Sequence, residues 1–267
     1  MKLNEKAQIV KGKAAHTCMF VSAHQDDIEI ACPMGVMDCY KKEDKGLVAV
    51  IVTDGGGSPR AGRFADYTYD QMVATRAKEQ AEAARIGDYS DLIMLFYTSA
   101  ETKDTTNTAP IDDIYNILME YQPEVLYTHN LADKHSTHVA VVLKTIAAVR
   151  RMPKELRPKK MYGCEGWRDL DWLPDDEKVL FDVSGSAEVM TAALRAHVSQ
   201  VEGGKSYDAA VVGRRVSNAT FSQSHSVDTA EAIAIAMDIT PLIENDDMDI
   251  KQFVVDKIER FKNSLYI

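Results

Sequence analysis

Two short polar clusters contain the residue types that metal-assisted hydrolysis needs. One is the segment 24–27, His-Gln-Asp-Asp, and the other is 135–138, His-Ser-Thr-His. Each follows a run typical of a buried strand and precedes a run typical of a helix. Because ligands bind beyond the carboxyl ends of parallel strands, the two clusters are expected to face each other there. Imidazoles with one carboxylate suit a zinc-like ion, and a second carboxylate remains for proton transfer. The residues therefore indicate a metal-dependent hydrolase.

The spacing within the clusters predicts a role for each side chain. His24, Asp27 and His138 would hold the ion and leave an open fourth position, as in catalytic zinc sites. Asp26 would take the proton of the attacking water, or else only orient a histidine or cap a turn. His135 would hydrogen-bond a developing oxyanion, protonate a leaving amine, or support the site structurally.

Three further polar residues are weaker candidates for contact with a substrate. Asp133 would either hold the His135 imidazole in orientation or only tighten its loop. Arg60 and Arg63 follow the glycine run 55–57. They would clamp an anionic substrate group, or simply be solvated loop residues.

Two aromatic side chains in the second half of the chain are also candidates. Trp167 lies in a glycine-bounded polar turn and would stack on a sugar face, or be a half-buried core residue. His197 would either line the pocket or only pack a helix.

Apolar runs alternate with helical spacing along the chain. The expected strands are 17–23, 47–53, 91–96 and 124–128, with short strands at 159–163 and 179–183. The expected helices are 30–42, 69–86, 111–121, 137–151, 188–200, 207–216 and 250–262. This alternation predicts βαβ units and a mostly parallel sheet in an α/β protein. We expect one domain over 1–267, with a core of about 15–200 and a C-terminal elaboration of about 201–267.

Composition narrows the class of partner. The net charge is -10 with no long Lys/Arg run, so nucleic acid and anionic membrane surfaces are not expected as partners. The four cysteines show no CxxC spacing and read as buried thiols in a reducing compartment. No stretch reaches the ~20 apolar residues of a membrane span. We therefore expect a cytoplasmic protein that acts on a small molecule.

Five segments resemble motifs of one enzyme family, in the family's order. Residues 22–29, Ser-Ala-His-Gln-Asp-Asp-Ile-Glu, resemble the A-H-P-D-D-x-E signature of the LmbE-like, or PIG-L-type, N-deacetylases. Residues 135–138 match both histidines of the family's H-P-D-H motif. The segments 52–55, 76–87 and 193–200 are similar to its T-D-G loop, its R-x-x-E…L-G helix and its A-L-x-x-H-x-S-Q segment.

The resemblance implies a Rossmann-like three-layer sandwich and zinc-dependent hydrolysis of N-acetyl groups, typically on N-acetylglucosamine compounds. It implies that His24, Asp27 and His138 bind Zn²⁺ and that Asp26 is the general base. His135 would stabilise the oxyanion or act as the acid. Iron(II) suits the same ligands. Relatives often form homo-oligomers, so oligomeric state is left open.

Other matches and departures concern the surroundings of these ligands. Arg76 matches the arginine that contacts the substrate sugar in the family. Gln25 replaces the usual proline, Thr137 replaces an aspartate, and Asp133 stands where some relatives have a tyrosine. The departures keep two alternatives open. One is a metal-dependent amidase acting on a non-sugar amide or thiol conjugate, and the other is a non-catalytic relative that binds a metal or a sugar.

Overall fold

A computed structural model describes residues 1–265 and contains one eight-stranded sheet. The strands are β1 (Gln8–Lys11), β2 (Cys18–Ser22), β3 (Leu47–Thr53), β4 (Asp91–Tyr97), β5 (Val125–His129), β6 (Lys160–Cys164), β7 (Lys178–Asp182) and β8 (Ile233–Asp238). The helices are α1 (Asp27–Ala31), α2 (Pro33–Cys39), α3 (Tyr69–Ile86), α4 (Ser99–Lys103), α5 (Ala109–Tyr121), α6 (Ser136–Arg150), α7 (Ala187–Arg195), α8 (Val198–Val201), α9 (Tyr207–Phe221), α10 (Pro241–Glu244) and α11 (Ile250–Asn263).

The strand order is β1-β4-β3-β2-β5-β6-β8-β7. The five central strands are parallel, and β1, β8 and β7 each pair antiparallel to their neighbours. The chain runs outward from β2 through β3 and β4, then returns to the other side of β2 with β5. Such a reversal of strand order opens a crevice at the carboxyl edge, where α/β folds bind ligands.

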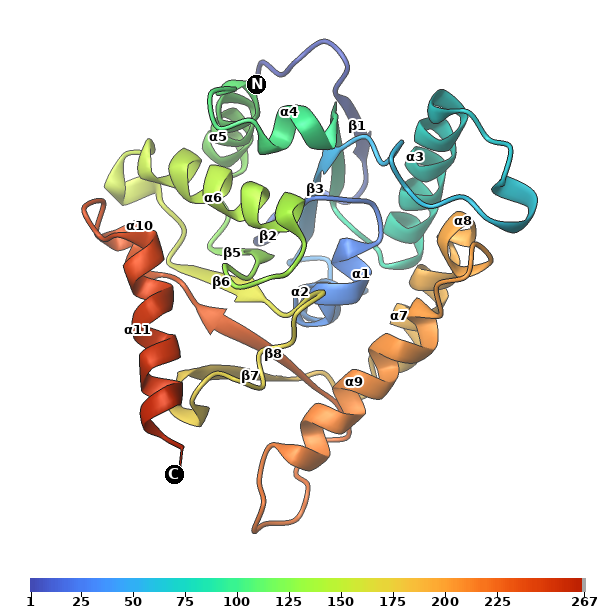
Figure 1. Ribbon diagram of the computed structural model, residues 1–267. Coiled ribbons are helices and arrows are strands. Elements are labelled where there is room, and N and C mark those ends of the chain that lie inside the picture. Colours follow the sequence, from blue (N-terminus) through green and yellow to red (C-terminus); the bar gives the residue numbers. More distant parts are fainter. Residues whose placement is uncertain (266–267) are drawn as a thin grey trace.

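Helices cover both faces of this sheet, which makes three layers (Figure 1). Alternate strand residues divide between two apolar clusters, because successive side chains of a strand point to opposite faces. Met19 and Val21 pack toward α5, α6 and α10, whereas Cys18 and Phe20 pack toward α1, α2, α3 and α7. The expected fold class, an α/β sandwich around a mostly parallel sheet, is confirmed.

Several elements differ from the expected ranges for identifiable reasons. The helix expected over 30–42 is split into α1 and α2 at Pro33, because proline cannot continue the hydrogen bonding of the preceding turn. The helix expected over 188–200 is likewise split, and His197 separates α7 from α8. Strands β1 and β8 were not predicted, and β8 inserts between β6 and β7. In residues 1–265 we find no helix with the length and apolar character of a bilayer span.

Candidate metal centre and active-site cleft

Three side chains that carry possible metal-donor atoms, called the donor group below, meet where β2 and β5 end. His24 follows β2, Asp27 begins α1, and His138 lies in the first turn of α6. His24 Nδ1 lies 3.2 Å from both Asp27 Oδ2 and His138 Nε2, and His138 Nε2 lies 3.3 Å from Asp27 Oδ1. Zinc bonds of roughly 2.0–2.1 Å in a tetrahedron place ligand atoms about 3.3 Å apart. The two histidine nitrogens have this spacing, whereas Asp27 meets His24 with Oδ2 and His138 with Oδ1. Among the described residues, two sets of three place one donor atom from each residue within 4.8 Å of one another: His24, His135 and His138, and Asp27, His129 and His138.

The charged side chains of this group shift one another's pKa values. Although burial opposes it, the contacts with His138, His129 and His24 hold the pKa of Asp27 well below its usual range. Burial also lowers the pKa of His138, but Asp27 and Asp133 outweigh it and raise that pKa to about 10. The raised pKa favours the protonated His138 ring, which lies between the carboxylates of Asp27 and Asp133.

Asp133 contacts the ring of His138. We had expected it to contact the ring of His135 instead. Asp133 Oδ2 lies 3.3 Å from His138 Nδ1 and accepts a bond from the Trp167 amide, whereas Oδ1 accepts the His135 backbone N–H. Gly166 permits this approach, because a Cβ there would lie 2.7 Å from Asp133 Oδ2. A carboxylate on the far nitrogen of a metal-binding imidazole fixes its tautomer and orientation.

His129, the last residue of β5, is a site residue that the sequence analysis missed. Its ring is buried and stacks on His138 with centroids 3.8 Å apart. His129 Nε2 accepts the Ala23 backbone N–H at 2.9 Å and lies 3.4 Å from Asp27 Oδ2. Burial lowers the pKa of His129 to about 4, so the ring is neutral. The expected strand ended at residue 128, one position short, although a histidine at a strand end was the available signal.

Asp26 adopts a left-handed backbone conformation, and its carboxylate contacts Arg76. Its φ is 85° and its amide donates to Gln80 Oε1, while its Oδ2 lies 3.2 and 3.3 Å from the two terminal nitrogens of Arg76. Burial raises the pKa of Asp26, and the Arg76 charge offsets only part of this. Such backbone strain in a buried, bonded residue is typical of functional sites.

Arg76, for which the resemblance implied a contact with the sugar, is bonded to Asp26 at the wall of the cleft. Its side chain is 2% exposed and also donates to the Gln25 carbonyl. Although Arg76 lines the cleft, its charge is engaged by Asp26. Gln25 itself donates from its amide to the Thr53 carbonyl at 3.1 Å. The turn that lacks the family's proline is thus tied to the end of β3 by a side-chain hydrogen bond.

The His135 ring lies beside the donor group, in contact with His24 and His138. It packs edge-on to His24 and stacks on His138 and Trp167. Burial, His24 and His138 lower the pKa of His135 to about 4. His135 Nδ1 is buried without a hydrogen-bond partner among the described residues. A neutral imidazole of this kind can donate one hydrogen bond to an oxyanion.

Two cavities adjoin the donor group. The first, which we call the cleft, has a volume of about 400 Å³ and is lined by His24, Asp26, Asp27, His135, Thr137, Arg76, Gln200 and residues of the 55–59 loop, among others. The second, the side chamber, has a volume of about 140 Å³ and is lined by Asp27, His129, His138, Ile30, Ala31, Gly166, Trp167, Tyr207, Ala210, Val211 and Arg214. Trp167 lines both, so the structure brings this candidate to the site.

Three other candidates lie elsewhere. Arg60 folds back on its own loop and donates to the Gly56 carbonyl, and Arg63 pairs with Glu202 in an exposed contact. His197 is fully buried, and its Nε2 lies 3.3 Å from Glu29 Oε2. None of these three lines the cleft or the side chamber. Each of the three instead contacts a residue of its own neighbourhood, and their expected substrate contacts stay predictions.

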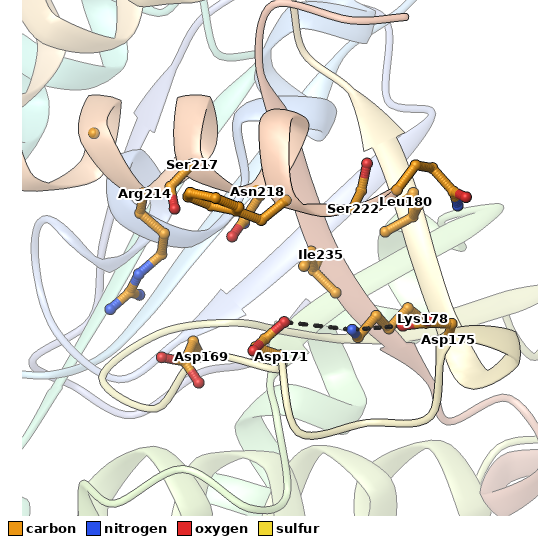
Figure 2. A pocket seen from close by; sticks show the side chains of 13 residues that line it. Asp169, Asp171, Asp175, Lys178, Leu180, Arg214, Ser217, Asn218, Ser222 and Ile235 are labelled. Carbon is orange, nitrogen blue, oxygen red and sulfur yellow. Dashed lines mark hydrogen bonds and ion pairs between the residues drawn. The ribbon is translucent and has the colours of Figure 1, made fainter. Parts of the chain in front are cut away.

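A separate cavity of about 520 Å³ lies between α9 and the turns before β7 (Figure 2). Lys178 crosses it, with Nζ 2.9 Å from Asp175 and 3.5 Å from Asp171. No histidine is among its lining residues, all of which belong to the described part of the chain. The chemistry therefore belongs to the cleft rather than to this cavity.

A comparison with known families matches the part of the chain that contains both polar clusters. The sequence model of PIG-L, described as GlcNAc-PI de-N-acetylase, matches residues 19–149. This match, which we call the PIG-L segment, covers just under half of the chain. The PIG-L segment includes both polar clusters, Arg76 and His129, so the resemblance seen in the sequence is confirmed. No curated protein sequence is significantly similar to the chain.

Solved structures share the fold at low sequence identity. The conserved protein TT1542 from Thermus thermophilus has a TM-score of 0.67 and 19% identity, covering 88% of this chain and 99% of its own. GalB, the 4-carboxy-2-hydroxymuconate hydratase from Pseudomonas putida, has a TM-score of 0.65 and 16% identity, with coverage of 84% and 96%. The N,N'-diacetylchitobiose deacetylase from Pyrococcus horikoshii has a TM-score of 0.62 and 16% identity, with coverage of 83% and 84%. Because a hydratase and a deacetylase share this fold, the reaction has to be argued from the site.

Proposed function

We propose that the protein is a zinc-dependent N-deacetylase that acts on a small N-acetylated amino-sugar compound. The observation that carries this is the contact among three side chains, the trio His24, Asp27 and His138. His24 Nδ1 lies 3.2 Å from His138 Nε2, and the two oxygens of Asp27 lie 3.2 Å from His24 and 3.3 Å from His138. The PIG-L family description names a de-N-acetylase, and a structural neighbour is a deacetylase of diacetylchitobiose. Both support hydrolysis of an N-acetyl group.

The chain's own residues supply the proton transfers. A divalent ion held by the trio would act as a Lewis acid toward the amide carbonyl and make the attacking water more acidic. Asp26, whose pKa burial raises, accepts the proton of that water and delivers it to the leaving nitrogen. The neutral His135 donates a hydrogen bond to the oxyanion. Water adds to the carbonyl carbon, the C–N bond breaks, and acetate and an amine result.

Polar groups of the cleft support the amino-sugar part of the proposal. Its walls include Ser58, Ser99, Lys103, Ser136 and Gln200, which offer hydroxyl, ammonium and amide groups to sugar hydroxyls. The indole of Trp167 borders the same space and provides an apolar face of the kind on which a sugar ring packs. Its volume of about 400 Å³ suits a monosaccharide or a small conjugate.

The test combines metal content with release of free amine from N-acetylglucosamine compounds. We expect His24→Ala and His138→Ala to lose bound zinc, and Asp26→Asn to keep zinc but lose about 10²- to 10⁴-fold in turnover. The exposed Asp66→Asn is the matched control and should retain both. Zinc should be added only to one equivalent, since one structural neighbour is a zinc-inhibited form of the teicoplanin deacetylase Orf2. Full turnover by Asp26→Asn would refute the assignment of the base.

A further inference from the structure

The cleft and the side chamber meet at the donor group. Both are lined by Asp27, Ile30, Trp167 and Tyr207, so they adjoin along these four residues. The side chamber reaches Asp27 and His138 from the side of α9, whereas the cleft reaches His24, Asp26 and His135. An amide substrate consists of an acyl part and an amine part. For hydrolysis, the C–N bond that joins the two parts has to lie at the donor group.

The walls of the two spaces differ in chemistry. The side chamber is bordered by Ile30 and Ala31 of α1 and by Ala210 and Val211 of α9, with the Trp167 and Tyr207 rings between them. Its charged groups are already bonded, since Arg214 donates to the Gly166 carbonyl and Asp27 contacts three imidazoles. The cleft is instead lined by hydroxyl, ammonium and amide groups. Apolar atoms of a substrate therefore gain most from the side chamber.

Volume distinguishes the two spaces further. The side chamber measures about 140 Å³, which at roughly 30 Å³ for each carbon-sized group holds about four to five of them. An acetyl group places only its methyl beyond the carbonyl and would leave most of this space unfilled. An amino-sugar ring with its hydroxyls, about twelve heavy atoms at that same volume, exceeds the side chamber but fits the cleft.

We propose that the side chamber is an acyl subsite and that the preferred substrates carry N-acyl groups of four to six carbons rather than acetyl. This inference rests on the proposed amide hydrolysis and changes its acyl specificity. The amine part of the substrate occupies the cleft. The products are a short-chain carboxylate and the free amine. Ala210 and Val211 of α9 set the length of chain that fits.

The first experiment compares N-acetyl-, N-butanoyl- and N-hexanoylglucosamine by release of free amine. Burial of each added methylene is worth about fourfold in kcat/KM, so butanoyl, with two more methylenes, should exceed acetyl by about 15-fold. A kcat/KM for acetyl that exceeds both longer chains would overturn the acyl subsite while leaving the deacetylase proposal intact. Absence of amine release from the whole series would refute both proposals together.

The second experiment narrows the side chamber with matched variants of α9. Ala210 and Ala209 are adjacent exposed residues of this helix, but only Ala210 lines the side chamber. We expect Ala210→Leu to lower the ratio of hexanoyl to acetyl kcat/KM at least tenfold, whereas Ala209→Leu keeps the wild-type ratio. Equal ratios in the two variants would overturn the assignment, because leucine is tolerated in helices at either position.

A binding measurement separates recognition from turnover. In the Asp26→Asn background, calorimetry with N-hexanoyl- and N-acetylglucosamine should show tighter binding of the hexanoyl compound, by about tenfold or more. Adding Ala210→Leu should abolish this difference. Equal affinity for both compounds in the Asp26→Asn protein would contradict an apolar subsite, whatever the rates show.

Discussion

At the scale of single residues, the charge of Arg76 affects the pKa of Asp26. Its guanidinium contacts Asp26 Oδ2 through two nitrogens, and both residues are buried. Arg76→Lys keeps a positive charge but loses this planar geometry. The pKa of Asp26, already raised by burial, should then rise further. Because the base must be ionised, we expect the acid limb of the kcat/KM profile to move about one unit to higher pH.

The control for this change lies on the same helix. Arg85 of α3 is exposed, and its one ion pair within residues 1–265 is with Glu82, so Arg85→Lys should leave the pH profile unchanged. A profile of Arg76→Lys that coincides with the wild type, in a protein with a normal melting curve, would show that Arg76 does not control Asp26. A direct contact of Arg76 with the sugar would instead raise KM at every pH.

His129 contacts two parts of the candidate metal centre, the backbone before His24 and the ring of His138. Its Nε2 accepts the Ala23 amide, one residue before His24, and its ring stacks on His138. His129→Leu would leave a buried backbone N–H without a partner and remove that stacking. We expect zinc affinity to fall by roughly 10- to 100-fold, as for other outer-shell changes, measured by competition with a chelator. His225→Leu, at an exposed position, should bind zinc like the wild type.

At the scale of elements, the turn after β6 determines how α6 presents His138. Gly166 lies against Asp133, and a Cβ there would lie 2.7 Å from Asp133 Oδ2. Gly166→Ala should push this carboxylate away from His138 Nδ1 and weaken zinc binding about tenfold or more. Gly213→Ala is the control, because a Cβ at that position of α9 meets no atom within 4 Å. It should be slightly stabilising, by about 0.4–1 kcal/mol, without effect on zinc. Equal zinc affinity in both variants would contradict the role of the turn.

The elements that the sequence predicted well are those with strong local signals. The ranges 47–53 and 69–86 coincide with β3 and α3, since one is an unbroken apolar run and the other has a capping box at Thr68 and ends at Gly87. By contrast, β1 is exposed along its whole length and was missed. Its place in the sheet depends on pairing with β4, about eighty residues away, which no local pattern contains.

Some features of the site could likewise be predicted from the sequence, and others could not. That residues 24–27 and 135–138 would meet followed from the rule that ligands bind at the carboxyl edge of a parallel sheet. The partners of Asp133 and Arg76 did not follow, because they depend on side-chain directions within loops. Asp133 bonds His138 rather than the His135 ring, and Arg76 bonds Asp26. His197 is a further example. It lies in a segment that resembles a family motif, but its side chain is buried against Glu29.

At the scale of the whole molecule, the proposed zinc ion would compete with a proton for His138 Nε2. The pKa of His138, raised to about 10, exceeds its ordinary value of 6.5. Protonation of His138 therefore stabilises the metal-free fold fully below about pH 6.5, and this stabilisation is lost as pH rises through 10. Across this window His129 and His135, with pKa values near 4, stay neutral, and Asp27 stays ionised. His138 is thus the group whose proton zinc has to displace.

Zinc should consequently stabilise the protein more at high pH than at low pH. One displaced proton makes the apparent affinity rise by up to tenfold per pH unit, so from about pH 6.5 to 8.5 the zinc contribution to stability grows by about 2.7 kcal/mol. For a chain of this size that corresponds to a further rise in Tm of roughly 5–10 °C. Melting curves with saturating zinc and with EDTA at both pH values measure it. His138→Ala should show no zinc-dependent shift at either pH, and a wild-type shift that is independent of pH would mean that zinc binds without displacing the proton of His138.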